Sequence, residues 1–119
     1  MTLPNDPLPV REAAEHGGLT IHLLPAKTRC VVLLDGELDL ASVPTLEREL
    51  GRLIAAEPEM LIVDLERLSF IDSSGLRCLL EAANAAASNG DALRFMGATG
   101  HVEEMLQLTD IKRQLRFID

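Results

Sequence analysis

The sequence has few aromatic residues and few cations. Its 119 residues include no tryptophan, no tyrosine and three phenylalanines, and 11 Lys and Arg stand against 19 Asp and Glu. The formal charge of −8 repels phosphates, and there are few aromatic rings on which bases could stack. Both features argue against direct nucleic-acid binding.

Long apolar runs are also missing. No run approaches the roughly 20 residues that cross a bilayer, so we expect no membrane insertion. The N-terminus lacks a basic cluster followed by an apolar stretch, so no secretory signal is expected. The two cysteines, Cys30 and Cys78, lie in apolar stretches and form neither a disulfide framework nor a metal cage. We therefore expect reduced, buried thiols in a cytoplasmic protein.

The first 18 residues differ from the rest of the chain. Pro4, Pro7 and Pro9 interrupt this segment and Gly17-Gly18 closes it, which is typical of a flexible tail. Within the tail, residues 10–16 could form one or two helical turns. Residues 19–119 are long enough for one core, and 47% apolar residues in the chain favour a folded domain.

From residue 19 onward, apolar periodicity predicts alternating strands and helices. Strands are expected at 19–24, 30–34, 60–65, 92–96 and 115–118, and helices at 42–56, 74–88 and a short segment ending near 108. The continuous apolar run 30–34 is typical of a strand covered on both faces. The first two strands are expected to pair antiparallel, and the later crossovers require parallel pairs. The order predicts an α/β fold with a mixed sheet.

Two acidic loops are expected at one edge of this sheet. One is 35–39, after the strand 30–34, and the other is 70–75, which leads into the second long helix. Because parallel strands open at the same edge, Asp39, Asp72, Ser73 and Ser74 should share a rim. A serine just before the helix could also be a simple N-cap.

Enzymatic uses of this rim have weak support. A nucleophilic serine hydrolase typically has the motif Gly-x-Ser-x-Gly, and here Ile71 stands in place of the first glycine. None of the three histidines, His16, His22 and His101, offers a convincing base. Carboxylates at Asp35, Glu37, Asp39 and Asp72 could bind a hard cation, but calcium-loop spacing is absent, so a solvated acidic rim is expected.

Ser73 could instead accept a phosphate. The phosphate would add about −1.5 to −2 charges at a helix N-terminus, where free N–H groups tolerate an anion. It would place that charge beside Asp39 and Asp72 on a surface offered to a partner. A hundredfold loss of affinity requires only about 2.7 kcal/mol, so one phosphate is sufficient for a binding switch.

Three segments carry a family resemblance. Gly36-Glu37-Leu38-Asp39 after an apolar strand, then 61–65 (LIVDL), then 68–76 (LSFIDSSGL) resemble a STAS domain, and more narrowly the stand-alone anti-sigma factor antagonists of bacteria. The segments 106–111 (LQLTDI) and 115–118 (LRFI) are similar to the closing part of the family. The resemblance covers 19–118 and implies a mixed sheet of four or five strands with helices mainly on one face.

The resemblance implies a phosphorylation-controlled binding protein, not an enzyme, with no cofactor and no metal. Ser73 matches the phosphorylated serine. The implied partners are an anti-sigma factor that is also a serine kinase of the histidine-kinase-like ATPase type, and a PP2C-type phosphatase. The unmodified form would bind the anti-sigma factor and free the sigma factor for transcription. The implied partner-binding residues are Gly36, Glu37, Leu38, Asp39, Asp72, Ser73, Ser74, Gly75 and Leu76.

The chain departs from the family pattern in three places. Asp110 stands where glycine is frequent, and aspartate tolerates the left-handed conformation expected there. His101 stands where proline is frequent, and no function is attached to it. The final helix of other members has no counterpart, so residues 10–16 are expected to cover part of that surface. A non-switching STAS subunit of a lipid-transport ATPase complex or of a sensory scaffold remains the alternative.

Overall fold

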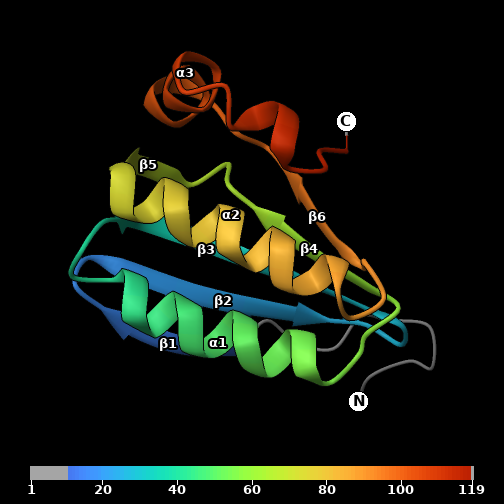
Figure 1. Ribbon diagram of the computed structural model, residues 1–119. Coiled ribbons are helices and arrows are strands. Elements are labelled where there is room, and N and C mark those ends of the chain that lie inside the picture. The colour runs from blue at the N-terminus through green and yellow to red at the C-terminus, as the bar shows by residue number, and fades with distance from the viewer. Residues whose placement is uncertain (1–10, 119) are drawn as a thin grey trace.

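The computed structural model describes residues 11–118, which form a mixed sheet covered by helices (Figure 1). The sheet has six strands in the order β1-β2-β3-β4-β6, and β5 pairs with β3. The strands are β1 Arg11–His16, β2 Leu19–Pro25, β3 Arg29–Leu38, β4 Met60–Asp64, β5 Leu68–Ile71 and β6 Leu93–Met96. The helices are α1 Val43–Ala55, α2 Ser73–Ala87, α3 Gly100–Leu108 and a 3-10 helix at Lys112–Gln114.

The predicted fold class is confirmed. β2 and β3 pair antiparallel, whereas β3 pairs in parallel with both β4 and β5, and β4 with β6. Helices α1 and α2 lie side by side on one face of the sheet (Figure 1). The described residues contain six strands where four or five were expected.

The core lies between this face of the sheet and the two long helices. Val32 and Leu34 of β3 are fully buried in it, together with Leu46 of α1 and Leu79 of α2. The alternate residues of β3 point to the other face of the sheet and are half-buried. The expectation that 30–34 is covered on both faces therefore holds fully for one face only, and the other face is half-buried. No helix in the described part of the chain is long and apolar enough to span a membrane.

The N-terminal segment is part of the sheet. Arg11–His16 forms β1, which pairs antiparallel with β2 from Arg11 opposite Leu23 to His16 opposite Leu19. Gly17 and Gly18 have φ angles of +61° and +87° and form the hairpin turn, a conformation that glycine adopts readily. The predicted helical turns at 10–16 are thus wrong, because pairing with β2 satisfies the backbone better than an isolated short helix. Residues 1–10 of the predicted tail lie outside the described residues.

The C-terminal segment differs from the prediction as well. Residues 115–118 do not form a strand: one isolated parallel bridge joins Phe117 to Phe95, after the 3-10 helix at Lys112–Gln114. The expected left-handed position is confirmed at Asp110, which has a φ of +63°. Its carboxylate pairs with Arg113.

Candidate functional site

The ends of β3 and β5 bring the two predicted acidic segments together. Residues 35–38, expected in a loop, extend β3 instead, and Leu38 pairs with Ile71 of β5. The Asp72 N–H donates to the Leu38 carbonyl over 3.2 Å. The segments that contain Asp39 and Ser73 therefore leave adjacent parallel strands at one edge of the sheet, as the sequence predicts. The strand that brings them together is β5, which the apolar pattern of the sequence did not predict.

Asp72 is the N-cap of α2. Its Oδ1 accepts a hydrogen bond from the Gly75 N–H at 2.9 Å, which satisfies one of the free donors of the first turn. Neither Ser73 nor Ser74 is the N-cap, so the prediction that a serine caps this helix is wrong. Ser73 is the first residue of the helix and is exposed, whereas Ser74 is half-buried. The Ser73 hydroxyl is therefore accessible at a helix N-terminus.

Gly75 lets α2 start against the end of β3. A Cβ at this position would lie 2.6 Å from the Leu38 carbonyl oxygen and 2.7 Å from Ile71 Cγ1. Neither distance is tolerable for a carbon atom, and one neighbour is backbone. Gly36 is equally constrained, since its φ is +118° and a Cβ would lie 1.9 Å from the Gly18 carbonyl oxygen.

The Asp39 carboxylate holds the turn between β3 and α1. Its Oδ1 accepts hydrogen bonds from the N–H groups of Ala41 at 3.0 Å and Ser42 at 3.3 Å. Ser42 is the N-cap residue of α1, but its side chain makes no cap hydrogen bond. The buried Ser42 hydroxyl instead donates to the Glu37 carbonyl at 2.9 Å. Asp39 and Asp72 thus fix two adjacent turns. These carboxylates therefore have a structural role in addition to the solvated one that was predicted for the acidic rim.

Two exposed apolar side chains lie beside these turns. Leu40, next to Asp39, is 75% exposed, and Phe70, opposite Glu37 in the β3–β5 register, is 42% exposed. The Phe70 ring stacks on His101 of α3, with ring centroids 5.0 Å apart and planes within 2°. Neither Leu40 nor Phe70 was predicted from the sequence as part of the site. The available signal for Leu40 was its place directly after the acidic segment 35–39, outside the apolar stripe of the helix predicted at 42–56.

The predicted partner-binding residues divide into surface and core. Glu37, Asp39, Asp72, Ser73 and Ser74 have exposed or half-buried side chains. In contrast, Leu38 is 0% exposed and Leu76 is 3% exposed, so these two side chains belong to the hydrophobic core. In this conformation the side chains of Leu38 and Leu76 are therefore not available to a partner, and both support the site from beneath.

The histidines of residues 11–118 form no hydrogen bond to Ser73, and the acidic groups there form no metal-binding cluster. His16 Nδ1 contacts the Ala41 carbonyl at 3.3 Å and His101 Nε2 contacts the Ile71 carbonyl at 3.2 Å, and no hydrogen bond within residues 11–118 joins a histidine to Ser73. Over the same residues, no group of three or more His, Cys, Asp or Glu side chains could hold a metal ion.

Known proteins resemble this chain in sequence and in fold. Residues 20–119 match the STAS domain family. An anti-sigma-B factor antagonist of Staphylococcus aureus (strain NCTC 8325 / PS 47) is 30% identical over 81 residues, which cover 68% of this chain and 75% of that protein. An anti-sigma factor antagonist from Mycobacterium paratuberculosis superposes with a TM-score of 0.75 at 20% identity, over 98% of this chain and 89% of that chain.

A second similar structure is the phosphorylated form of the Bacillus cell fate determinant SpoIIAA. It superposes with a TM-score of 0.63 at 21% identity, over 83% of this chain and 91% of that chain. Since the family match covers most of the chain, this protein belongs to the STAS domain family.

Proposed function

We propose that this protein is an anti-sigma factor antagonist whose binding is switched by phosphorylation of Ser73. The unmodified form binds an anti-sigma factor in the cytoplasm and thereby frees a sigma factor for transcription. The observation that carries the proposal is the exposed Ser73 hydroxyl at the first position of α2, beside the turn that Asp39 holds. A buried hydroxyl at this position would be out of reach of any kinase.

The surface around Ser73 suits a docking partner. Leu40 and Phe70 offer exposed apolar area, and the adjacent turns are fixed by hydrogen bonds from Asp39 and Asp72. A preformed surface loses little conformational entropy when it binds. We infer that the anti-sigma factor covers Leu40, Phe70 and the N-terminus of α2 together.

Phosphorylation would change this surface without unfolding it. The kinase transfers the γ-phosphoryl group of ATP to Ser73 Oγ, the hydroxyl loses its proton, and ADP leaves. The remaining free N–H groups of the first helical turn stabilise the phosphate locally. The same phosphate adds about −1.5 to −2 charges beside Asp39 and Asp72, and burying that charge under a partner is costly.

The partner classes follow from relatives in the family. The Staphylococcus aureus relative is named an anti-sigma-B factor antagonist, and SpoIIAA has a structure in a phosphorylated form. By analogy we propose that the anti-sigma factor is itself the serine kinase, of the histidine-kinase-like ATPase type, and that a PP2C-type phosphatase restores the free hydroxyl. The chain itself then acts by binding and not as an enzyme.

Substitution of Ser73 tests the proposal. We expect Ser73→Asp to weaken binding to the cognate kinase at least tenfold in calorimetry, equivalent to about 1.4 kcal/mol. Ser73→Ala should bind like the wild type and accept no phosphate. The matched control is Ser88→Asp, which places the same charge on an exposed serine at the other end of α2 and should bind normally. Equal affinities for the Ser73→Asp and Ser73→Ala variants would overturn the switch.

A further inference from the structure

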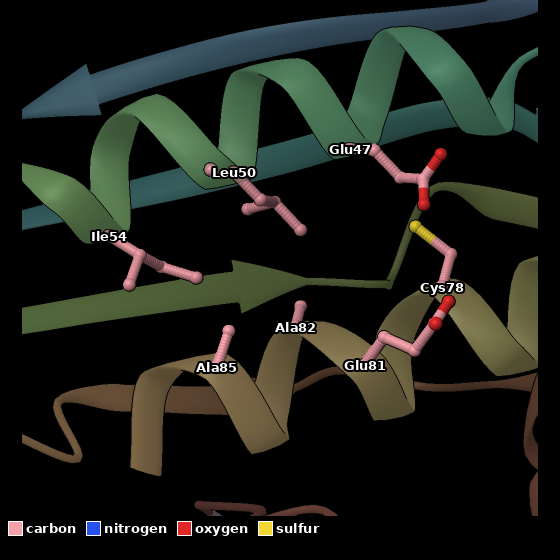
Figure 2. Close-up of a pocket in the computed structure, with 8 residues that line it drawn as sticks. Glu47, Leu50, Ile54, Cys78, Glu81, Ala82 and Ala85 are labelled. Carbon is pink, nitrogen blue, oxygen red and sulfur yellow. The ribbon is translucent and has the colours of Figure 1, made fainter. Parts of the chain in front are cut away.

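A groove separates α1 from α2 on the helical face of the molecule (Figure 2). Its volume is about 160 Å³. Leu50 and Ile54 of α1 and Ala82 and Ala85 of α2 form its apolar part. Figure 2 shows Glu47, Cys78 and Glu81 together at one end, and Ile54 and Ala85 at the other. The groove is thus apolar along its length and acidic at one end.

Gly51 keeps the α1 side of this groove open. Glycine in a helix interior costs about 0.5–1 kcal/mol relative to alanine, so its presence in the middle of α1 needs a reason. Its φ is not positive, and a Cβ built on it would meet no atom within 4 Å. Neither backbone conformation nor packing therefore requires glycine here. Its effect, together with Ala82 and Ala85 on the opposite helix, is to leave space between the helices.

The acidic end of the groove is formed by two exposed glutamates, Glu47 and Glu81. Among residues 11–118, neither Glu47 nor Glu81 forms an ion pair or a side-chain hydrogen bond. Burial, with smaller contributions from the charges of Glu47 and Glu81, raises the pKa of the Cys78 thiol to about 12. The thiol is therefore neutral and adds no charge of its own. Two unpaired carboxylates beside a neutral apolar wall favour a positively charged occupant.

We propose that the groove between α1 and α2 binds a small organic ammonium ion, with the ammonium group between Glu47 and Glu81 and its apolar body against Leu50, Ile54 and Ala85. The volume agrees with this class, because an apolar cavity of about 150 Å³ accommodates a molecule the size of benzene. A chain of about six carbons is of that size. The site is separate from the proposed Ser73 switch, since neither Ser73 nor its neighbours line the groove.

Titration with n-hexylammonium, followed by amide chemical shifts, tests the site. We expect saturable shifts at Gly51, Cys78, Ala82 and Ala85, weaker binding of the neutral n-hexanol and no binding of n-hexanoate. The double variant Glu47→Gln/Glu81→Gln should lower the affinity for n-hexylammonium at least tenfold and leave that for n-hexanol unchanged. Gly51→Leu, which fills the groove, should abolish binding of both.

Two controls separate this site from other effects. Glu49→Gln removes an α1 carboxylate that is paired with Arg52 outside the groove, and it should bind n-hexylammonium like the wild type. Ser73→Ala should also bind normally, so a failure of the proposed switch leaves this test intact. Equal affinity for n-hexanoate, no saturable shift at the groove, or full affinity in the double glutamine variant would overturn the proposal.

Discussion

Gly75 connects the core to the candidate site at the scale of a single residue. Any side chain there collides with the Leu38 carbonyl and with Ile71, so α2 would have to move away from β3. Because Ser73 and Asp72 lie at the same helix end, such a shift would also displace the proposed phosphorylation site. Glycine at this position therefore serves packing and placement together.

Gly75→Ala should destabilise the protein by about 1–3 kcal/mol, the usual cost of an extra methyl group in a filled site. Urea unfolding measures the change. The matched control is Gly51→Ala, also in a helix, where the added methyl group meets no atom within 4 Å and should stabilise by up to about 1 kcal/mol. If the two substitutions had the same effect on the free energy of unfolding, steric crowding at Gly75 would not be the cause.

At the scale of elements, β1 extends the sheet beyond residues 20–119, which match the STAS family. It pairs with β2 along its length, so the β2 backbone is not left at an open edge. Leu19 and Ile21 of β2 are fully buried, and helix α1 also packs near β1. Residues 11–18 are thus part of the fold.

Removal of residues 1–17 should lower the melting temperature by several degrees, because β2 then loses its partner strand. The control is removal of residues 1–10 alone, which leaves β1 complete. We expect most of the decrease in melting temperature, measured by calorimetry, to require the longer deletion. A melting temperature that does not change when residues 1–17 are removed would contradict a stabilising role for β1.

Elements with strong periodicity could be predicted from the sequence, and short or charged ones could not. The apolar stripes of α1, α2 and β2–β4 indicated their positions correctly, apart from the C-terminal extension of β3. β1 has the sequence REAAEH, without apolar alternation, and β5 has four residues next to a loop motif. Both are strands because neighbouring strands pair with them, which is a tertiary effect. The segment 115–118 has an apolar pattern but only one bridge partner.

The position of the candidate site at one edge of the sheet could be predicted from the sequence, but the packing of its side chains could not. Parallel strands open at one edge, which correctly placed Asp39 near Ser73. The stacking of Phe70 on His101 joins residues 31 positions apart, so no local pattern could indicate it. The burial of Leu38 and Leu76 also depends on packing and not on the motif in which they lie.

At the scale of the whole molecule, an ion pair attaches the C-terminal segment to α3. Lys112 Nζ lies 2.6 Å from Glu103 Oε1 and also lies over the Phe117 ring. The hydrogen bond from Lys112, with a further one from Gln107, lowers the pKa of Glu103 below its ordinary value of 4.5. The deprotonated carboxylate is therefore favoured in the folded state.

The contribution of the Lys112–Glu103 pair to the free energy of unfolding should be present above pH 4.5. It should be lost as the pH falls through the lowered pKa of Glu103. Glu103→Gln should destabilise by less than about 1 kcal/mol near neutral pH, because both side chains are partly exposed. The difference in the free energy of unfolding between Glu103→Gln and the wild type, measured by urea unfolding, should become smaller below pH 4.5. Glu104→Gln, at an exposed neighbour, should show no such narrowing, and a Glu103→Gln difference that stayed constant with pH would contradict the assignment.

The central claim is that phosphorylation of Ser73 controls partner binding, and one measurement on native material tests it most directly. The protein is used to capture its partner from a lysate of its source cells, and the partner-bound and unbound pools are analysed by intact mass. The account predicts an unmodified bound pool and an unbound pool that is heavier by one phosphoryl group, about 80 Da, located at Ser73. A phosphorylated protein that remains in the partner-bound pool would contradict it.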